Sequence, residues 1–257
     1  MENSLPTESV EVLGHAPEAA PPYRRAKQQI VLIGASGHAR VILDILQLTG
    51  TYEIVGLIDS FKPRGISLGG HEILGSPDEI PALVDQGAFS AAIVCVGDNW
   101  TRARIVDGIR RAVPNFTFVS AIHPAATVSR DAVIGEGTVI MAGAVVNPGC
   151  QVGEYCIINT RASLDHDSVM DSYSSLGPGV TTGGCVRIDA YSAIGIGATI
   201  LQDLHIGRHT VVGAAAAVFH NLPDSVVAYG VPARIIRSRQ PGDRYLSESK
   251  TEAGGAR

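Results

Sequence analysis

The sequence is poor in aromatic residues and cysteine, and it has no long apolar run. Aromatic residues make up 5% of its 257 residues, with a single tryptophan, so a tryptophan-lined recognition surface is not expected. The cysteines (Cys95, Cys150, Cys156 and Cys185) show no CxxC spacing. A chain of this length needs no disulfide staples, and we expect reduced thiols packed in the core. No apolar run is long enough to predict a transmembrane helix.

An excess of basic charge is also lacking. The formal net charge is -5, which argues against a general nucleic-acid binder or a binder of anionic membranes. Residues 1–28 combine acidic residues and prolines with no apolar stretch, so we expect a disordered tail there and not a signal peptide. Residues 238–257, with Pro, Gly, Ser and mixed charge, are expected to form a second disordered tail. These features favour a cytoplasmic protein.

Apolar and amphipathic segments alternate after the first tail. Apolar runs at 30–33, 53–59 and 91–97 have the length of buried strands, and amphipathic stretches follow the first and the third of them. Strands that alternate with helices predict a small parallel sheet. We therefore expect a Rossmann-like α/β domain over residues 29–120.

The turn after the first apolar run suggests a nucleotide site. Its sequence is GASGHA at residues 34–39, and it leads into an amphipathic stretch that ends at Gly50. Backbone N–H groups at a helix N-terminus favour phosphate, and ligands of parallel sheets bind at the carboxyl ends of the strands. The spacing is not the full GxGxxG fingerprint, so a ligand-free turn fits equally well. Asp59, at the end of the second run, is either a ribose or base acceptor or a turn residue.

From Val128 the sequence repeats every six residues. Sixteen consecutive hexads run from Val128 to Pro223 without an insertion, and fifteen of them begin with an aliphatic residue, Thr182 being the exception. The fifth residue of the hexads is usually small. A six-residue apolar period fits neither an α-helix nor a simple strand, and it is the period of a β-helix.

Three hexads form one coil of such a β-helix, so each residue stacks about 4.8 Å from its equivalent in the next coil. The first residue of each hexad points into the prism, and the small fifth residue fits near a corner. Gly, Asn and Asp at the positions between them serve the turns. We expect a left-handed parallel β-helix over residues 121–237.

Four motifs extend this pattern to a family resemblance. They are INTRASLDHD at 158–167, GVPA at 230–233, GASGH at 34–38 and DSFK at 59–62. Residues 29–237 resemble the bacterial sugar O-acyltransferase family, which includes sialic acid O-acetyltransferases and nucleotide-amino-sugar N-acetyltransferases of glycan synthesis. The resemblance implies a homotrimer with acetyl-CoA in the cleft between adjacent β-helices and a nucleotide-sugar on the front domain. It also implies direct transfer with one His as general base and no acyl-enzyme.

His166 is the expected general base. Imidazole titrates near neutrality, and the third position of the hexad lies toward a turn. Asp165 and Asp167 flank His166, and a carboxylate bonded to one ring nitrogen fixes the tautomer and supports the imidazolium. The resemblance favours Asp167 as the acid that orients His166. In the other interpretation, residues 165–167 form an ordinary polar turn without a catalytic role. Stacking places Gly184 one coil above His166, where its N–H is the expected oxyanion donor, or where Gly183 and Gly184 simply allow a tight turn.

The resemblance implies the remaining site residues. Acetyl-CoA is expected against small residues of later coils, most of which are also ordinary repeat residues, and the acceptor is expected on the front domain and at Asn159, which also fits an ordinary turn. The expected acceptor residues are Ser36, Gly37, His38, Asp59, Lys62, Gly97, Asn99, Arg102 and Asn159, and the expected CoA residues are Gly184, Ile196, Gly197, Ala198, Ala214, Ala215, Gly230 and Pro232. Ser60 stands where many relatives have a second acid, and Asp98 where they often have Asn, so the nucleotide (UDP, GDP or none) stays open.

The sequence leaves three functions open. An N-acetyltransferase that acts on a nucleotide-linked amino sugar is favoured. A sugar O-acetyltransferase of the sialic acid type would use the same base, and a non-catalytic hexapeptide-repeat assembly protein would not need the Asp-His-Asp motif at 165–167. No cluster has metal-ligand spacing, so no metal is expected. The histidines of the hexad turns (His205, His209 and His220) are expected to be solvated, and Cys150, Cys156 and Cys185 have no His in register.

Overall fold

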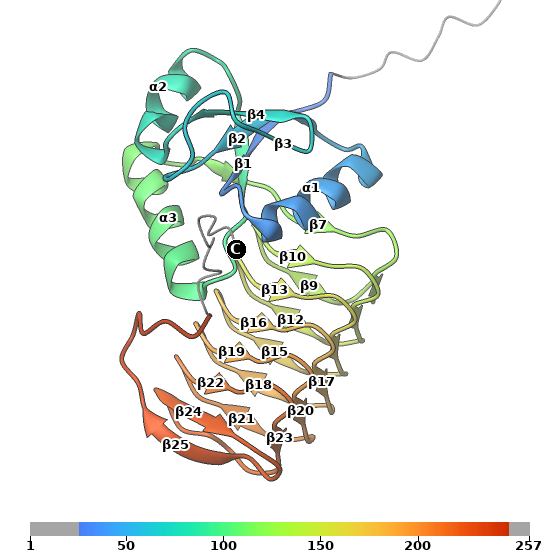
Figure 1. Ribbon diagram of the computed structural model, residues 1–257. Coiled ribbons are helices and arrows are strands. Elements are labelled where there is room, and N and C mark those ends of the chain that lie inside the picture. Colours follow the sequence, from blue (N-terminus) through green and yellow to red (C-terminus); the bar gives the residue numbers. More distant parts are fainter. Residues whose placement is uncertain (1–25, 247–257) are drawn as a thin grey trace, which may run out of the picture.

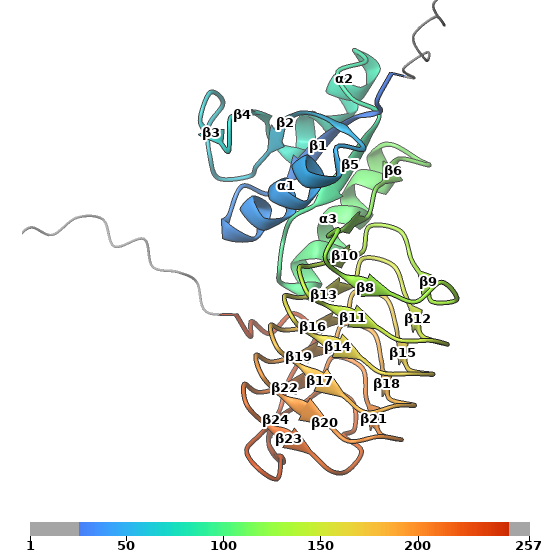
Figure 2. The ribbon, with the colours of Figure 1, turned by 90° about the vertical axis from the view of Figure 1, so that its right-hand side faces the viewer.

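The computed structural model describes residues 26–246 and contains an α/β domain followed by a β-helix (Figures 1 and 2). Most of the two expected tails, residues 1–25 and 247–257, lies outside the described residues. Among the described residues, no helix has the length and apolar character that a membrane crossing requires.

The α/β domain is built on a six-stranded sheet of order β3-β4-β2-β1-β5-β6. Ile30 and Leu32 of the central strand pack on one side with α1, whereas Val31 and Ile33 pack on the other side with α2 and α3. This alternation is that of a strand buried on both faces. The elements are β1 (Gln29–Ile33), α1 (Gly37–Thr49), β2 (Glu53–Ile58), β3 (Ser67–Leu68), β4 (His71–Gly75), a 3-10 turn (Pro77–Glu79), α2 (Ile80–Asp85), β5 (Ala91–Val94), α3 (Asn99–Ala112) and β6 (Thr117–Phe118).

Between β1 and β5, which are parallel, the direction in which successive strands are added to the sheet reverses. From β1 the chain moves to β2 on one side of the sheet and later returns to β5 on the other side. Ligands of parallel α/β sheets bind at such a reversal, beyond the carboxyl ends of the strands. Gly34 makes the crossing possible, because its φ is 103° and an added Cβ would lie 3.1 Å from the carbonyl oxygen of Cys95.

The β-helix is a three-sided prism (Figure 2). Its first face is an eight-stranded sheet, its second face a six-stranded sheet and its third face a five-stranded sheet. The first face consists of β7 (Ala121–Ile122), β10 (Val139–Ile140), β13 (Ile157–Ile158), β16 (Ser175–Leu176), β19 (Ala193–Ile194), β22 (Val211–Val212), β24 (Val226–Tyr229) and β25 (Arg234–Ser238). The second consists of β8 (Thr127–Val128), β11 (Val145–Val146), β14 (Ser163–Leu164), β17 (Thr181–Thr182), β20 (Thr199–Ile200) and β23 (Ala217–Val218), and the third of β9 (Val133–Ile134), β12 (Gln151–Val152), β15 (Val169–Met170), β18 (Arg187–Ile188) and β21 (His205–Ile206).

The hexad register sets the packing of the prism. Val139 pairs with Ile157 and Ile140 with Ile158, which is the expected stacking of equivalent residues in successive coils. The first and fifth residues of the hexads form one buried apolar cluster. The expected fold class, a Rossmann-like domain followed by a left-handed parallel β-helix, is confirmed. We call the corner between the first and second faces the first corner, that between the second and third faces the second, and that between the third and first faces the third.

A stack of rings runs along the third corner. Tyr155, Tyr173, Tyr191 and His209 are equivalent residues of successive coils, and their ring centroids lie 5.0, 5.3 and 4.7 Å apart. His209 is therefore buried and not solvated as expected, because stacking brings its ring onto Tyr191. Burial, together with nearby Arg side chains, lowers the pKa of His209. Trp100 of α3 packs edge-on against the last two rings of the stack, so the stack also fixes the α/β domain.

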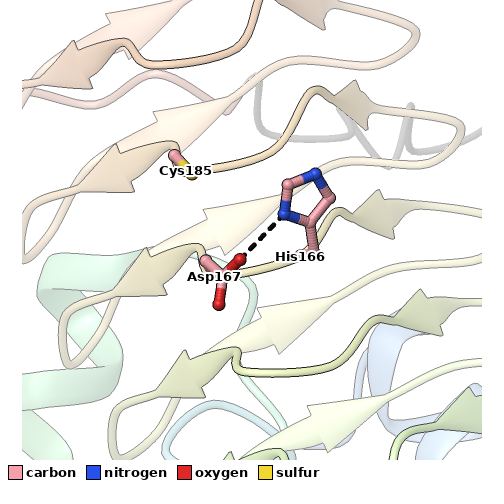
Figure 3. Close-up of side chains that lie close together, drawn as sticks. All are labelled: His166, Asp167 and Cys185. Carbon is pink, nitrogen blue, oxygen red and sulfur yellow. Dashed lines mark hydrogen bonds and ion pairs between the residues drawn. The ribbon is translucent and has the colours of Figure 1, made fainter.

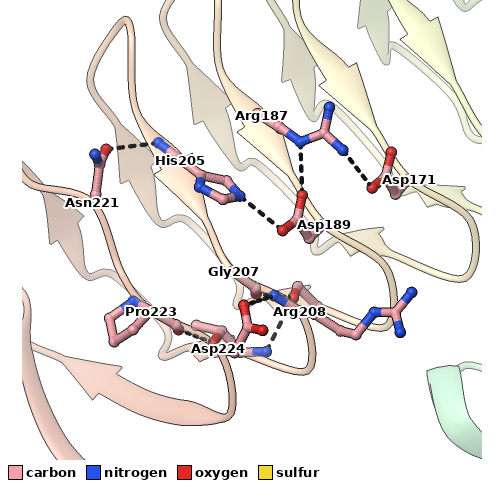
Figure 4. Close-up of polar contacts among 11 residues, drawn as sticks. Asp171, Arg187, Asp189, His205, Gly207, Arg208, Asn221, Pro223 and Asp224 are labelled. Carbon is pink, nitrogen blue, oxygen red and sulfur yellow. Dashed lines mark hydrogen bonds and ion pairs between the residues drawn. The ribbon is translucent and has the colours of Figure 1, made fainter.

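A polar network joins three coils on and beside the third face (Figure 4). Arg187 Nη2 lies 2.9 Å from Asp171 Oδ2, and Arg187 Nε lies 2.8 Å from Asp189 Oδ1. His205 Nε2 lies 2.8 Å from the other oxygen of Asp189. Because most of these groups are well exposed, the network adds little stability compared with the buried core.

Ser238 ends β25, and residues 239–246 bond to distant segments of the chain, so residues 238–246 are not part of a disordered tail, which corrects this part of the expectation for 238–257. Arg239 is buried and donates from Nη1 to the carbonyl oxygen of His209 at 2.7 Å. The hydroxyl of Tyr245 accepts a hydrogen bond from the backbone N–H of Asn99 at 3.0 Å. The polar composition misled the prediction, because the partners of these side chains come from segments far away in the sequence. We call residues 239–246 the C-terminal strap.

Candidate active site

The turn between β14 and β15 presents His166 at the second corner (Figure 3). Asp165 holds this turn, because it accepts hydrogen bonds from the N–H of His166 at 2.8 Å and from Asn147 Nδ2 at 2.6 Å. The N–H of Asp165 donates to Thr182 Oγ1 of the next coil at 3.0 Å. The only first residue of a hexad that is not aliphatic thus anchors the turn that carries His166.

His166 and Asp167 form a hydrogen-bonded pair. His166 Nδ1 lies 2.9 Å from Asp167 Oδ2. This bond raises the pKa of His166 above its ordinary value of 6.5, with smaller contributions from the charges of Asp165 and Asp203. The side chain of His166 is 57% exposed, so its second ring nitrogen, Nε2, is accessible to a substrate. Of the two flanking acids, Asp167 is the one that orients the ring, while Asp165 shapes the turn.

Gly184 lies against the imidazole from the next coil. An added Cβ would overlap His166 Nε2, so glycine leaves the space that the ring occupies. The N–H of Gly184 donates no hydrogen bond to another residue between 26 and 246. The residue that packs against the imidazole therefore has an unpaired backbone donor, and such a donor can stabilise a developing oxyanion.

Cys185 departs from its expected place in the core. It is exposed, and its Sγ and the ligand atoms of His166 and Asp167 all lie within 4.8 Å of one another. Cys185 is the stacking equivalent of Asp167, one coil further on. Its closeness to His166 was not predicted, because His166 is not the stacking equivalent of Cys185 but a neighbour of that equivalent. Local desolvation, followed by the charges of Asp203 and Asp167, raises the pKa of the Cys185 thiol, so little of the nucleophilic thiolate is present at neutral pH. The absence of a metal stays a prediction.

A cavity of about 430 Å³ lies between the reversal point of the α/β sheet and the first face of the prism. It brings together five of the expected residues: His38, Gly97, Asn159, Ile196 and Ala214. Two residues of the C-terminal strap, Tyr245 and Leu246, also line it. The expected acceptor residues and the expected CoA residues therefore share one cavity.

His38 faces this cavity as a neutral imidazole. Burial, and after it the charge of Arg102, lowers the pKa of His38 to about 4. Its Nε2 is buried and has no hydrogen-bond partner among the described residues. A buried polar atom without a partner is costly unless a ligand satisfies it. Asn159 offers a similar group, since its Oδ1 accepts from the N–H of Thr160 at 2.8 Å and its Nδ2 bonds to no other described residue.

Asp59 and Lys62 hold the glycine turn. Asp59 accepts hydrogen bonds from the N–H of Ala35 at 2.7 Å and of Lys62 at 2.9 Å, and Lys62 Nζ donates to the carbonyl oxygen of Ala35. Ser36 and Gly37 stay exposed at the start of α1, where no side chain caps the helix. The open N–H groups of this first turn favour an anion.

Arg102 and Asn99 do not line the cavity, contrary to expectation. Each is 1% exposed. Arg102 donates to the carbonyl oxygens of Tyr155 at 2.8 Å and of Val96 at 2.9 Å, and to Asn99 Oδ1 at 2.6 Å. Asn99 Nδ2 donates to the carbonyl oxygen of Ser192 at 3.0 Å. The polar atoms of both side chains are bonded to groups that join the α/β domain to the β-helix. Neither side chain is therefore available to bind an acceptor sugar.

The expected CoA residues divide by exposure. Ile196, Gly197, Ala214 and Ala215 are exposed at the first corner, and Gly230 and Pro232 are exposed in the loop between β24 and β25. Ala198 is 0% exposed inside the prism, so its side chain cannot contact a cofactor. The hexad position explains this, because Ala198 is a fifth residue and its Cβ points inward.

His166 and the cavity lie on different corners of the prism. The cavity borders the first face and the first corner, while His166, Asp167 and Gly184 occupy the second corner. One chain therefore does not bring its base to its own cavity. Sequence reasoning also missed Asn147, Thr182, Tyr245 and Leu246. Of these, Thr182 carried a signal as the only first residue of a hexad that is not aliphatic, and Asn147 as the stacking equivalent of Asp165.

A hexapeptide β-helix that carries a corner His–Asp pair, joined to an α/β domain with a ligand cavity, defines a hexapeptide-repeat acyltransferase. Comparison with known proteins narrows this class. Residues 29–109 match the family described as PglD N-terminal domain, and residues 131–166 match bacterial transferase hexapeptide (six repeats). The chain is 34% identical over 118 residues to UDP-N-acetylbacillosamine N-acetyltransferase of Bacillus subtilis (strain 168), a match over 45% of this chain and 52% of that relative, so the match spans about half of the relative's length.

Two solved structures match over nearly their whole lengths. One is a His-to-Ala mutant of GDP-perosamine N-acetyltransferase from Caulobacter crescentus in complex with CoA and GDP-perosamine, with 36% identity, a TM-score of 0.77 and coverage of 82% of this chain and 97% of that chain. The other is the acetyltransferase domain of PglB from Neisseria gonorrhoeae FA1090 in complex with acetyl coenzyme A, with 33% identity, a TM-score of 0.76 and coverage of 82% and 100%. The chain belongs to the nucleotide-amino-sugar N-acetyltransferases of the hexapeptide-repeat family. This confirms the expected family and the expected class of enzyme.

Proposed function

We propose that the protein transfers the acetyl group of acetyl-CoA to the amino group of a nucleotide-linked amino sugar. The bond between His166 Nδ1 and Asp167 Oδ2, which leaves Nε2 open beside the N–H of Gly184, carries this proposal. The relatives support it, because the Caulobacter enzyme is solved with CoA and GDP-perosamine and the Neisseria domain with acetyl coenzyme A. The expected cytoplasmic location stays a prediction.

The chemistry follows from the two groups at the second corner. The neutral amine of the sugar attacks the thioester carbonyl, and its proton passes to His166 Nε2 as the C–N bond forms. The carbonyl oxygen gains negative charge and accepts the hydrogen bond of the Gly184 N–H. When the C–S bond breaks, the CoA thiolate leaves and His166 returns the proton to sulfur. Asp167 stabilises the imidazolium between these steps.

A homotrimer completes the site in this proposal. Because His166 and the cavity lie on different corners of one prism, an acceptor in the cavity needs the base of a second copy. Packing around a threefold axis brings the second corner of one prism to the first corner of its neighbour, and cyclic closure repeats this contact three times. Acetyl-CoA then lies in the cleft between the prisms, along Ile196, Gly197, Ala214 and Ala215.

The test of the proposed function is a thiol-release assay with acetyl-CoA. Candidate acceptors are UDP- and GDP-linked amino sugars, with hydroxyl-only sugars as the comparison. We expect release only with amino sugars, and we expect His166→Ala to lower kcat about 10²- to 10⁴-fold while the fold and oligomer stay intact. Acetylation of hydroxyl-only sugars alone would show an O-acetyltransferase. Release with no acceptor, or normal turnover in a folded His166→Ala protein, would contradict the proposal.

A further inference from the structure

We propose that the C-terminal strap forms one wall of the acceptor cavity, with Tyr245 as a positioning residue and Leu246 as a residue that sets acceptor specificity. This inference rests on the proposed function. It concerns two side chains that the family motifs do not include, and four observations carry it.

Tyr245 fastens the strap to both domains. Its hydroxyl accepts from the N–H of Asn99, the first residue of α3, at 3.0 Å and lies 3.4 Å from the carbonyl oxygen of Gly97. Its ring packs on an apolar cluster of the first face, formed by Ala193, Val211 and Val227. The position of the Tyr245 ring is therefore fixed by polar contacts on one side and apolar contacts on the other.

Arg239 and Gly242 provide the other anchors. Besides its bond to the carbonyl oxygen of His209, Arg239 donates to the carbonyl oxygen of Asp243 and lies 5.7 Å from the centroid of the Tyr245 ring. Gly242 passes so close to Trp100 that an added Cβ would lie 2.9 Å from its Nε1. The strap is therefore held at three points, by the buried Arg239 and by the half-buried Gly242 and Tyr245.

Successive strap residues line two neighbouring cavities. Tyr245 and Leu246 line the cavity of about 430 Å³ that holds His38 and Gly97. Gly242 lines a groove of about 630 Å³ that also begins at the carboxyl ends of β2 and β5, near Ser60 and Asp98. A nucleotide-sugar bound at these strand ends meets the strap between the two spaces.

Leu246 lies close to Gly97, in the segment between β5 and α3. A Cβ added to Gly97 would lie 3.5 Å from Leu246 Cδ1. A sugar held against His38 and Gly97 would therefore contact the Leu246 side chain. A wall made by the end of the chain can vary between members while the β-helix stays the same.

The first test compares Leu246→Ala with Leu48→Ala in the full-length chain. Leu48 on α1 is the matched control, because it is 58% exposed, against 51% for Leu246, and lines neither cavity. We expect Leu246→Ala to raise the KM for the nucleotide-sugar about tenfold, because it removes ground-state contact, with the KM for acetyl-CoA and kcat changed less than about twofold. Leu48→Ala should leave all three constants unchanged. Equal constants in the two variants would overturn the role of Leu246.

The second test needs no activity. Trp100 is the only tryptophan of the chain and touches the strap at Gly242, so its fluorescence reports docking. We expect the double variant Arg239→Ala/Tyr245→Ala to shift Trp100 emission to the red and to increase acrylamide quenching, and Tyr245→Phe to keep the emission but raise the KM for the nucleotide-sugar. Unchanged emission in a folded double variant would overturn the docked strap.

The two tests separate this inference from the proposed function. A wild-type protein that acetylates no amino sugar removes the proposed function and, with it, the specificity role. A wild-type protein that is active, combined with a Leu246→Ala variant of unchanged KM, removes the specificity role alone.

Discussion

The hydrogen bond that Asp167 accepts from Nδ1 of His166 raises the pKa of His166 above the ordinary value of an imidazole. The protonated form gains from this bond, while catalysis needs the neutral form with Nε2 free. The hydrogen bond therefore narrows the pH range in which His166 can act as a base. In return it orients the ring and selects the tautomer that leaves Nε2 unprotonated.

The pH profile tests this pair. We expect kcat/KM to fall on the acidic side with a midpoint above 6.5, since His166 must lose its proton before it can act as a base. Asp167→Asn should move this midpoint down and lower kcat less than His166→Ala does. Asp165→Asn serves as the comparison, and a larger loss of kcat there would identify Asp165 as the orienting acid.

The close packing of Gly184 against His166 can be tested with a single substitution. Because a Cβ would overlap His166 Nε2, Gly184→Ala should displace the imidazole or the thioester. We expect kcat to fall about 10²- to 10³-fold, the usual effect of disturbing an oxyanion donor, with little change in the circular dichroism spectrum and the melting temperature. A folded Gly184→Ala protein with wild-type kinetics would show that the oxyanion donor lies elsewhere.

At the scale of the element, the second-corner turn depends on one hydroxyl inside the prism. Thr182 replaces the aliphatic residue of its hexad and accepts from the N–H of Asp165. A buried N–H without its acceptor is costly, so an aliphatic residue of the same shape should loosen the turn that carries His166 and leave the prism packing intact.

Thr182→Val tests this dependence against Thr181→Val, the neighbouring outward-facing residue of β17. We expect Thr182→Val to lower kcat several-fold and to reduce thermal stability, because both the turn and a buried donor are disturbed. Thr181→Val should change neither. If kcat in Thr182→Val matched the control, the turn would be held by Asn147 and Asp165 alone.

At the scale of the whole molecule, the separation of His166 from the cavity is the observation behind the proposed shared site. Mixing His166→Ala chains with Ala214→Trp chains, in which the cavity is filled, tests this arrangement. If each site takes its base from one chain and its cavity from the neighbour, a random equal mixture should recover about a quarter of wild-type activity, because closure is cyclic. No recovery after confirmed subunit exchange, or full activity of a monomer in sedimentation, would contradict the shared site.

The β-helix, its register and the turn that carries His166 could be predicted from the order of the residues alone. These follow from short-range periodicity, because stacking equivalents are a fixed number of residues apart and no insertion blurs the count. The neighbourhood of His166, Asp167 and Gly184 could therefore be worked out from position alone. The strand–turn–helix pattern determined the α/β domain in the same way, with Gly34 at the close crossing.

The contacts between the α/β domain and the β-helix could not be predicted in this way. From the sequence, the polar side chains of Arg102 and Asn99 were expected to bind a ligand. In the structure they bond to backbone groups of distant coils. The strap has the composition of a tail, and it is ordered because Tyr245 and Arg239 find acceptors, donors and rings far away in the chain. Periodicity contains no information on contacts between units of different period, so the joint, the cavity and its strap wall required the folded molecule.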